Sequence, residues 1–237
     1  MHPEMLELYS QQTKCLVALD SIIFGFDGEE LKLLLVKRGV VPNNDSWSLM
    51  GGWLQPSESL DQAADRILYE LTGLTDVYLE QLSAFGDPQR DPIERTVSIT
   101  YFALINVPDY DAKISDEYQA QWFPSYQLPD NMLFDHREMV ELAKTRLRNK
   151  AAYQPIGFEL LPQKFTIPQL QKLYEAIYET KMDKRNFSRK ILSTKLLVKL
   201  KEKQKGFSKK GAFLYSIDMD QYQSLMNSFL NFIPLKG

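Results

Sequence analysis

The sequence has a single cysteine, Cys15, and only 2 histidines among its 237 residues. One cysteine cannot form an internal disulfide or a Cys-X-X-Cys zinc site, and this scarcity predicts a reducing compartment. No apolar run approaches the length of a membrane span, and the segment from Met1 to Lys14 lacks the apolar core of a signal peptide. We therefore expect a cytoplasmic protein that has no membrane partner.

Positive charge is scarce in the first two thirds of the chain and concentrated in the last third. From residue 160 onward there are 15 Lys and Arg but only 6 Asp and Glu. Residues 1–159 contain 13 Lys and Arg and 25 Asp and Glu. The local net charges are +9 and −12, within an overall charge of −3. Such asymmetry indicates a nucleic-acid partner for the basic part. The alternative is that two domains drifted apart in charge.

The most informative stretch runs from Gly51 to Leu74 and has the pattern of a glycine turn, an amphipathic helix and a closing glycine. Pro56 and Ser57 favour a helix start, and Gly73 favours a helix end in the left-handed conformation. Between them, apolar residues recur at helical spacing: Leu60, Ala63, Ala64, Ile67, Leu68 and Leu71.

This stretch resembles the Nudix box, whose glutamates hold magnesium for cleaving nucleoside diphosphates joined to another group. The residues in the family's register are Gly52, Glu58, Arg66, Leu68, Glu70, Gly73 and Leu74. Two positions depart, because Ile67 and Leu71 stand where the family has glutamates. Magnesium requires oxygen ligands, which these side chains lack, although both could equally widen the core stripe. We therefore expect a Nudix scaffold that is not an enzyme, with no catalytic residue, no metal site and no cofactor.

The flanking sequence predicts the rest of a Nudix-like domain over residues 1–150. Asp27-Gly28 is a turn signal between two of five expected strands, which cover residues 15–26, 31–38, 77–85, 96–107 and 121–123. A helix to about residue 150 should begin at Asp135, with Glu138 completing a capping box and His136 as a helix-start residue. The expected fold class is α/β (α+β): a Nudix-like α/β/α sandwich with a mixed sheet.

Candidate effector-binding residues follow from the same resemblance. An arginine can bind phosphate or sugar hydroxyls through its fork of donors, and a carboxylate can accept from hydroxyls. The candidates are Arg38, Trp47, Leu49, Glu58, Glu70, Arg90 and Asp91. Simpler roles stay open for four of them: a solvated strand end for Arg38, a core anchor for Trp47, and a turn cluster for Arg90 and Asp91.

The C-terminal part has the pattern of a winged helix-turn-helix domain over residues 163–237, after a connector over 151–162 that contains Pro155, Gly157 and Pro162. Thr166 and Gln169 have capping-box spacing before one helix, and Asp183 is the expected cap of a second, Lys184–Ser193. On the second helix, Phe187, Ile191 and Leu192 should face inward. Strands over 196–200 and 212–216 then flank a lysine-rich hairpin, and a helix is expected over 218–232.

A helix, a tight turn and a basic second helix are the arrangement in which the second helix enters the major groove. The wing should supply phosphate contacts. The candidate DNA-binding residues are Lys184, Arg185, Asn186, Ser188, Arg189, Lys190, Lys209 and Lys210.

The whole chain resembles the Nudix-related transcriptional regulators, which join a ligand-sensing Nudix-like domain to a C-terminal winged helix. The resemblance implies a homodimer on double-stranded operator DNA and an effector that is ADP-ribose-like or a pentose such as L-arabinose. Two alternatives stay open. One is a Nudix hydrolase of ADP-ribose or a related nucleoside diphosphate sugar, and the other is a protein-interaction module whose basic winged helix meets an acidic protein.

Overall fold

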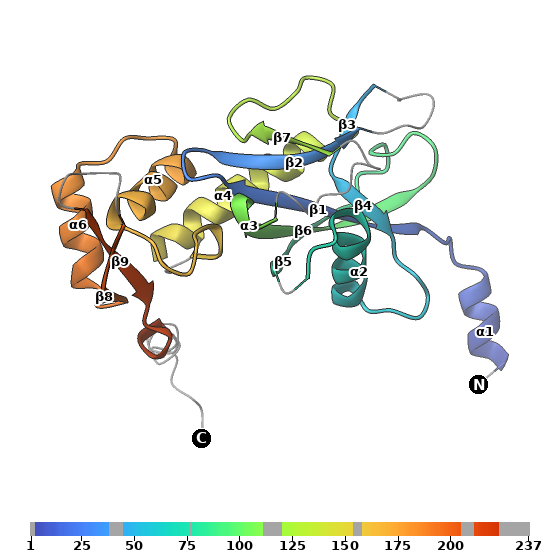
Figure 1. The fold of residues 1–237 in the computed structure, drawn as a ribbon. Coiled ribbons are helices and arrows are strands. Elements are labelled where there is room, and N and C mark those ends of the chain that lie inside the picture. The colour runs from blue at the N-terminus through green and yellow to red at the C-terminus, as the bar shows by residue number, and fades with distance from the viewer. Residues whose placement is uncertain are drawn as a thin grey trace.

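A seven-stranded mixed sheet forms the N-terminal part of the chain (Figure 1). The structure is a computed structural model and describes residues 3–37, 45–75, 77–110, 120–153, 158–204 and 211–222. The strands are β1 (Leu16–Phe26), β2 (Leu31–Lys37), β3 (Trp47–Ser48), β4 (Met50–Trp53), β5 (Tyr78–Phe85), β6 (Thr96–Asn106) and β7 (Ala120–Pro124). The order is β3-β2-β1-β6-β5, with β4 paired to β1 and β7 to β2. β1 and β6 run parallel at the centre, which confirms the predicted mixed sheet.

Two helices, α2 (Leu60–Thr72) and α4 (His136–Tyr153), cover opposite faces of the sheet. Side chains alternate across a strand, so β1 supplies both cores. Ile22, Phe24 and Phe26 pack in the cluster that contains α4, whereas Leu19 packs against α2 on the other face. The α/β/α sandwich is therefore built on β1.

The predicted end of α2 at Gly73 is confirmed, whereas its start lies two residues later than predicted. Ser59, not Ser57, is the N-cap: its side chain accepts from the Gln62 amide, and the Gln62 side chain accepts from the Ser59 amide. Gly73 ends the helix with φ of 69°, as glycine readily does. The expected start at Pro56 and Ser57 was wrong by two residues because the capping box at Ser59 satisfies the first amides.

The C-terminal part is a winged helix, as predicted. It contains α5 (Ile167–Tyr178), α6 (Lys184–Ser193), β8 (Leu197–Gln204) and β9 (Ala212–Ile217). Thr166 and Gln169 form the expected capping box, and Asp183 caps α6 through the Asn186 amide. β8 extends to Gln204, so the strand continues beyond the residue where we expected the hairpin to begin. The helix expected over 218–232 starts within the described residues, but residues 223–237 lie outside them.

The two parts share one hydrophobic core. Leu147 of α4 and Leu173 and Ile177 of α5 belong to the same buried cluster. The short helix η3 (Phe158–Leu160) continues that cluster through Phe158 and Leu160. The end of the connector therefore packs against both parts; residues 154–157 lie outside the described chain.

Two short helices were not predicted: α1 (Pro3–Ser10), and α3 (Val107–Tyr110) directly after β6. α1 projects from one end of the molecule, and the winged helix forms the other end (Figure 1). Among the described residues, no helix has both the length and the apolar character needed to cross a membrane.

Candidate effector and DNA-binding sites

Arg66 on α2 joins the two glutamates of the Nudix box. Its guanidinium donates from Nε to Glu58 Oε2 over 2.9 Å and from Nη2 to Glu58 Oε1 over 2.7 Å. Nη1 donates to Glu70 Oε2 over 3.1 Å, and Nη2 also donates to the Trp53 carbonyl over 3.0 Å. A bidentate pair is the strong form of this interaction. The bonds from Arg66 lower the pKa of the Glu58 carboxyl to about 2.

The apolar residues of the box, Ile67 and Leu71, pack toward the core. Ile67 is buried in one cluster with Leu19 and Ala63, and Leu71 is partly buried beside it. A Cβ added at Gly52 would lie 3.0 Å from the Ile67 side chain, so the glycine lets β4 approach α2 closely. In the part of the chain that the structure describes, no three His, Cys, Asp or Glu side chains are grouped to hold a metal ion.

A second polar cluster lies on the opposite face of the sheet, around Asp20 of β1. Ser98 Oγ donates to Asp20 Oδ2 over 2.5 Å, and Arg90 Nη2 lies 3.6 Å from the same oxygen. Arg90 also donates from Nε and Nη2 to both carboxylate oxygens of Asp135, over 3.0 and 2.8 Å. The Arg90 side chain is 3% exposed. A buried guanidinium is stable only with such partners, so these residues form a structural unit.

His136, the first residue of α4, extends this cluster. The Leu49 amide donates to His136 Nδ1 over 3.1 Å, and Nε2 lies 3.6 Å from Asp20 Oδ1. Asp135 was expected to cap α4, but its carboxylate binds Arg90 instead. The start of α4 is therefore held to β1 and to the segment before β4 by long-range polar contacts.

The predicted effector residues divide between the two faces of the sheet. Glu58 and Glu70 belong with α2, whereas Trp47 and Leu49 pack in the core on the α4 side, where Trp47 meets Phe123 edge-to-face at 4.7 Å. Arg90 lies in the buried cluster around Asp20. Asp91 lies in the loop before β6, where its carboxylate accepts from the Ile93 amide over 2.9 Å. Arg38 lies outside the described residues.

The sequence reasoning missed Asp20. The signal was present, because an aspartate in the middle of an otherwise apolar strand is buried at 7% exposure and needs partners. The partners could not be named from sequence, since Arg90, Ser98 and His136 lie about 70 to 116 residues further along the chain.

The exposed face of α6 carries the predicted DNA-binding side chains. Lys184, Arg185, Arg189 and Lys190 are exposed, and Asn186 accepts from Arg189 Nη2 over 3.0 Å. Ser188 is partly buried on the same helix.

The inner face of α6 is narrower than predicted. Phe187 packs on Tyr174 of α5 with ring centroids 5.6 Å apart, and Ile191 is buried. Leu192 is 44% exposed, so the expectation that it faces inward was wrong. It lies one residue past Ile191, and 100° of helical rotation turns its side chain toward solvent. Lys209 and Lys210 lie outside the described residues.

The C-terminal part of α4 contacts the end of α5, the helix that precedes α6. Arg148 donates from Nε to the Ile177 carbonyl over 2.9 Å and pairs through Nη2 with Glu179 at 2.8 Å. Lys144 reaches Glu179 at 3.0 Å, and the Tyr178 hydroxyl donates to the Arg148 carbonyl over 3.0 Å. Burial acts to raise the pKa of the Glu179 carboxyl, but Lys144 and Arg148 outweigh it and lower that pKa.

A cavity of about 390 Å³ lies beside this contact, between the sheet and the winged helix. Its wall includes Leu31 and Tyr126 from the sheet side and Glu175 from α5. Lys172 of α5 pairs with Glu29 of the β1–β2 turn across it. The cavity lies at the junction of the two parts and not at the Nudix box.

Two family models match the chain. A NUDIX domain matches residues 16–143, and an NrtR DNA-binding winged helix domain matches residues 157–217. The chain is 33% identical over 210 residues to the "ADPR responsive transcriptional repressor NtrR" of Acinetobacter baylyi, covering 87% of this chain and 84% of the relative. It is 30% identical over 126 residues to an ADP-ribose pyrophosphatase of Methanocaldococcus jannaschii, covering 53% and 70%.

Solved structures agree with both matches. NrtR of Shewanella oneidensis complexed with a 27mer DNA superposes with a TM-score of 0.77 at 30% identity, covering 87% of this chain and 95% of that one. A MutT/nudix family protein of Enterococcus faecalis shares the fold, with a TM-score of 0.72 at 24% identity over 92% and 94%. The chain therefore belongs to the Nudix family, in the NrtR group that joins a Nudix domain to a C-terminal DNA-binding winged helix.

Proposed function

We propose that this chain is a transcriptional repressor that binds operator DNA through its winged helix and senses an ADP-ribose-like nucleotide with its Nudix domain. The observation that carries the proposal is the alignment along both domains with a relative described as an ADPR responsive transcriptional repressor. The S. oneidensis protein bound to a 27mer DNA supports DNA as the partner. None of the relatives named above is described as a sensor of L-arabinose or another pentose, so the nucleotide is the favoured effector.

The proposed organisation has a sensor over residues 1–150, a connector over 151–162 and a DNA-binding domain over 163–237. In a homodimer, two α6 helices would enter successive major grooves, about 34 Å apart, on a pseudo-palindromic operator. The excess of Lys and Arg after residue 160 supports this arrangement, because it gives the DNA-binding domain a charge opposite to that of phosphate.

The proposed DNA contacts come from the exposed face of α6. Replacing Arg185 or Arg189 by Gln should weaken operator binding and lower the slope of log affinity against log salt by about one for each lost phosphate contact. Lys14→Gln is the matched control, because Lys14 is exposed and lies between α1 and β1, outside the winged helix. Equal affinities and slopes for all three variants and the parent would contradict the proposed role of α6.

For the effector, we propose contacts from the predicted residues that remain accessible, chiefly Glu70 and Asp91. Arg90 and Leu49 are buried, so no direct contact with the effector is proposed for them. Asp91→Asn and Glu70→Gln should each weaken ADP-ribose binding in calorimetry, whereas the surface control Asp130→Asn should not. A wild-type affinity in both variants would exclude this placement of the effector.

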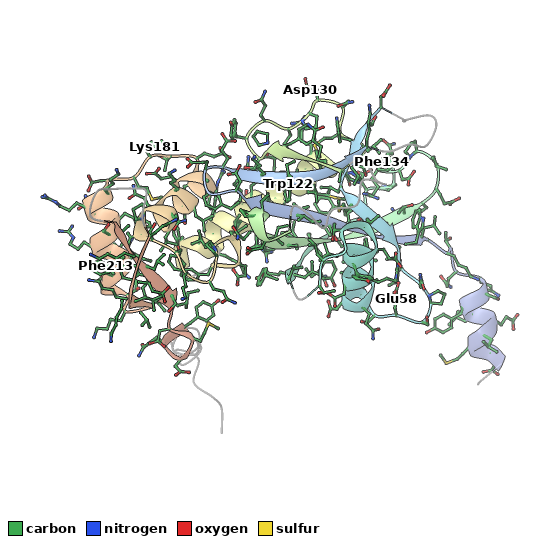
Figure 2. The ribbon with its side chains drawn as sticks, viewed as in Figure 1. Glu58, Trp122, Asp130, Phe134, Lys181 and Phe213 are labelled. Carbon is green, nitrogen blue, oxygen red and sulfur yellow. The ribbon has the colours of Figure 1, made fainter. Side chains whose placement is uncertain are left out.

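The link between effector and DNA is proposed to run through α4. The helix has 18 residues and is about 27 Å long. Its start adjoins the Asp20–Arg90–Asp135 cluster, and Arg148, 12 residues after His136, pairs with Glu179 at the end of α5. Figure 2 shows Phe134, next to the start of α4, at the end of the sheet away from Phe213 in the winged helix. A shift at the start of a rigid helix is transmitted to its other end, where α5 precedes the recognition helix. An effector can change the affinity for DNA only to the extent that it binds the DNA-competent arrangement of the protein more tightly or more weakly than the other arrangement.

Hydrolysis is the second candidate function, and the M. jannaschii pyrophosphatase is the observation that favours it. We propose instead that the box is not catalytic, because its residues do not fit a magnesium site. Ile67 and Leu71 offer no oxygen, and Arg66 already engages both glutamates. Magnesium-dependent turnover of ADP-ribose that Glu70→Gln abolishes would overturn this reading.

The test of the whole proposal is a gel shift on the DNA upstream of the chain's own gene, at fixed salt. ADP-ribose should change the fraction of DNA bound, and L-arabinose at the same concentrations should not. The proposal fails if the protein binds this DNA no better than an unrelated duplex, or if only the pentose has an effect.

A further inference from the structure

The wing carries two lysines that share one aromatic ring. Lys199 Nζ lies 3.7 Å and Lys203 Nζ 4.4 Å from the centroid of Phe213. All three side chains are exposed, and Phe213 is labelled at the winged-helix end of the molecule in Figure 2. An ammonium group is attracted to the negative face of a ring at such distances.

An irregularity in the hairpin brings both lysines to the same ring. β8 pairs Lys199 with Tyr215 and Lys203 with Phe213, so four steps along β8 match two steps along β9. In a regular ladder Phe213 would oppose Lys201 instead. Gly211, at a φ of 69°, leads into β9 where an added Cβ would lie 3.1 Å from the Gln204 carbonyl. A bulged strand is a recurrent way to redirect side chains at a functional surface.

Within the part of the chain that the structure describes, Lys199 and Lys203 form a pair of positive charges without a counter-charge. Neither Lys199 nor Lys203 has a carboxylate partner among the described residues, and Glu202 is bound by Lys164 over 2.8 and 2.9 Å. Two ammonium groups on one ring repel each other, and an exposed phenylalanine gains little from burial. An anion that binds close to both ammonium groups would stabilise the arrangement.

We propose that Phe213 is a positioning residue that holds Lys199 and Lys203 together as a clamp for one backbone phosphate of duplex DNA. This inference rests on the proposed function. It assigns three side chains to the phosphate contacts that the sequence predicted for the wing without naming these residues. The ring keeps two flexible side chains in one place, so less conformational freedom is lost when phosphate binds. The contact is to the backbone, and it therefore strengthens binding to any duplex sequence.

The test measures the affinity of the full chain for operator and for unrelated duplex over a series of salt concentrations. The double variant Lys199→Gln/Lys203→Gln should lower the slope of log affinity against log salt by about 0.9 on both duplexes, because one phosphate contact is lost, and each single variant should lower it by less. Phe213→Leu should weaken binding about three- to ten-fold, and Phe213→Tyr, which keeps a ring face, should restore it. Lys14→Gln controls for the change in net charge.

A double-mutant cycle separates positioning from a purely structural role. When Lys199 and Lys203 are both Gln, Phe213→Leu should cost no further affinity, because there is nothing left to position. The same loss in both backgrounds would overturn the inference, as would lysine variants whose slopes equal that of Lys14→Gln. If the parent chain binds no duplex at all, both the proposed function and the clamp are wrong. If the parent chain binds duplex DNA but the Lys199, Lys203 and Phe213 variants bind as Lys14→Gln does, only the clamp is wrong.

Discussion

At the scale of single residues, two arginines pair with the acidic side chains of the two polar clusters. Arg66 faces two box glutamates, and Arg90 is buried against Asp135 and close to Asp20. A carboxylate held by a bidentate arginine has its hydrogen-bonding capacity largely used. Both arginines therefore occupy most of the acceptor positions of the carboxylates that they bind. A ligand must either bind the remaining acceptor positions or displace the arginine.

Arg66→Gln should raise the pKa of Glu58 from about 2 toward its ordinary value of 4.5, because the lowering comes from the Arg66 bonds. Since the folded-state pKa is depressed, the pair stabilises the fold above pH 4.5 and loses its effect as the pH falls toward 2. Carboxyl carbon titration by NMR measures this directly. Glu70→Gln is the control and should leave the Glu58 pKa low; an unchanged Glu58 titration in Arg66→Gln would refute the assignment.

Asp135→Asn should lower the free energy of unfolding by about 3 to 5 kcal/mol, because it leaves Arg90 buried with a weaker partner. Urea denaturation provides the measurement. The matched variant Asp130→Asn removes the exposed carboxylate of a surface pair with Arg137, 3.8 Å apart, and should change stability by less than about 0.5 kcal/mol. Similar values for the two variants would show that the buried cluster is not a stabilising unit.

At the scale of elements, local patterns predicted α2, α5, α6 and the long strands, because each has its own caps and periodicity. The two-residue strand β3 and the four-residue β4 were not predicted, since such short strands exist only through their partners β2 and β1. The same limit applies to the site: Arg90 was singled out, but its partners Asp20 and Asp135 come from distant elements. The candidate effector residues could be chosen by resemblance, but their division between two faces could not.

The contact between α4 and α5 should carry the effector signal. Arg148→Leu removes two of the polar contacts to the end of α5, so DNA binding should persist while its response to ADP-ribose falls toward none. A typical allosteric coupling in the parent is about 5- to 150-fold. Arg146→Leu is the matched control, because Arg146 lies on the same helix but pairs with Glu80 of β5. Operator titrations with and without ADP-ribose decide the matter, and a full response in Arg148→Leu would exclude this route.

At the scale of the whole molecule, the acidic and basic parts are joined by one continuous core and by ion pairs across a cavity of about 390 Å³. The apolar contacts resist full separation of the two parts, while exposed ion pairs such as Lys172–Glu29 are weak and easily exchanged. This combination suits a small change in the position of the winged helix on the sheet. In the proposed homodimer, such a change would alter the spacing of the two α6 helices.

We propose that nucleotide binding and DNA binding are coupled through the junction between the sheet and the winged helix. Calorimetry of ADP-ribose binding to the free protein and to its operator complex tests it most directly. Thermodynamic linkage requires that DNA change the affinity for ADP-ribose by the same factor by which ADP-ribose changes the affinity for DNA. We expect a factor clearly different from one, equal in both directions. Identical ADP-ribose affinities for the free and DNA-bound protein, or no ADP-ribose binding, would contradict the account.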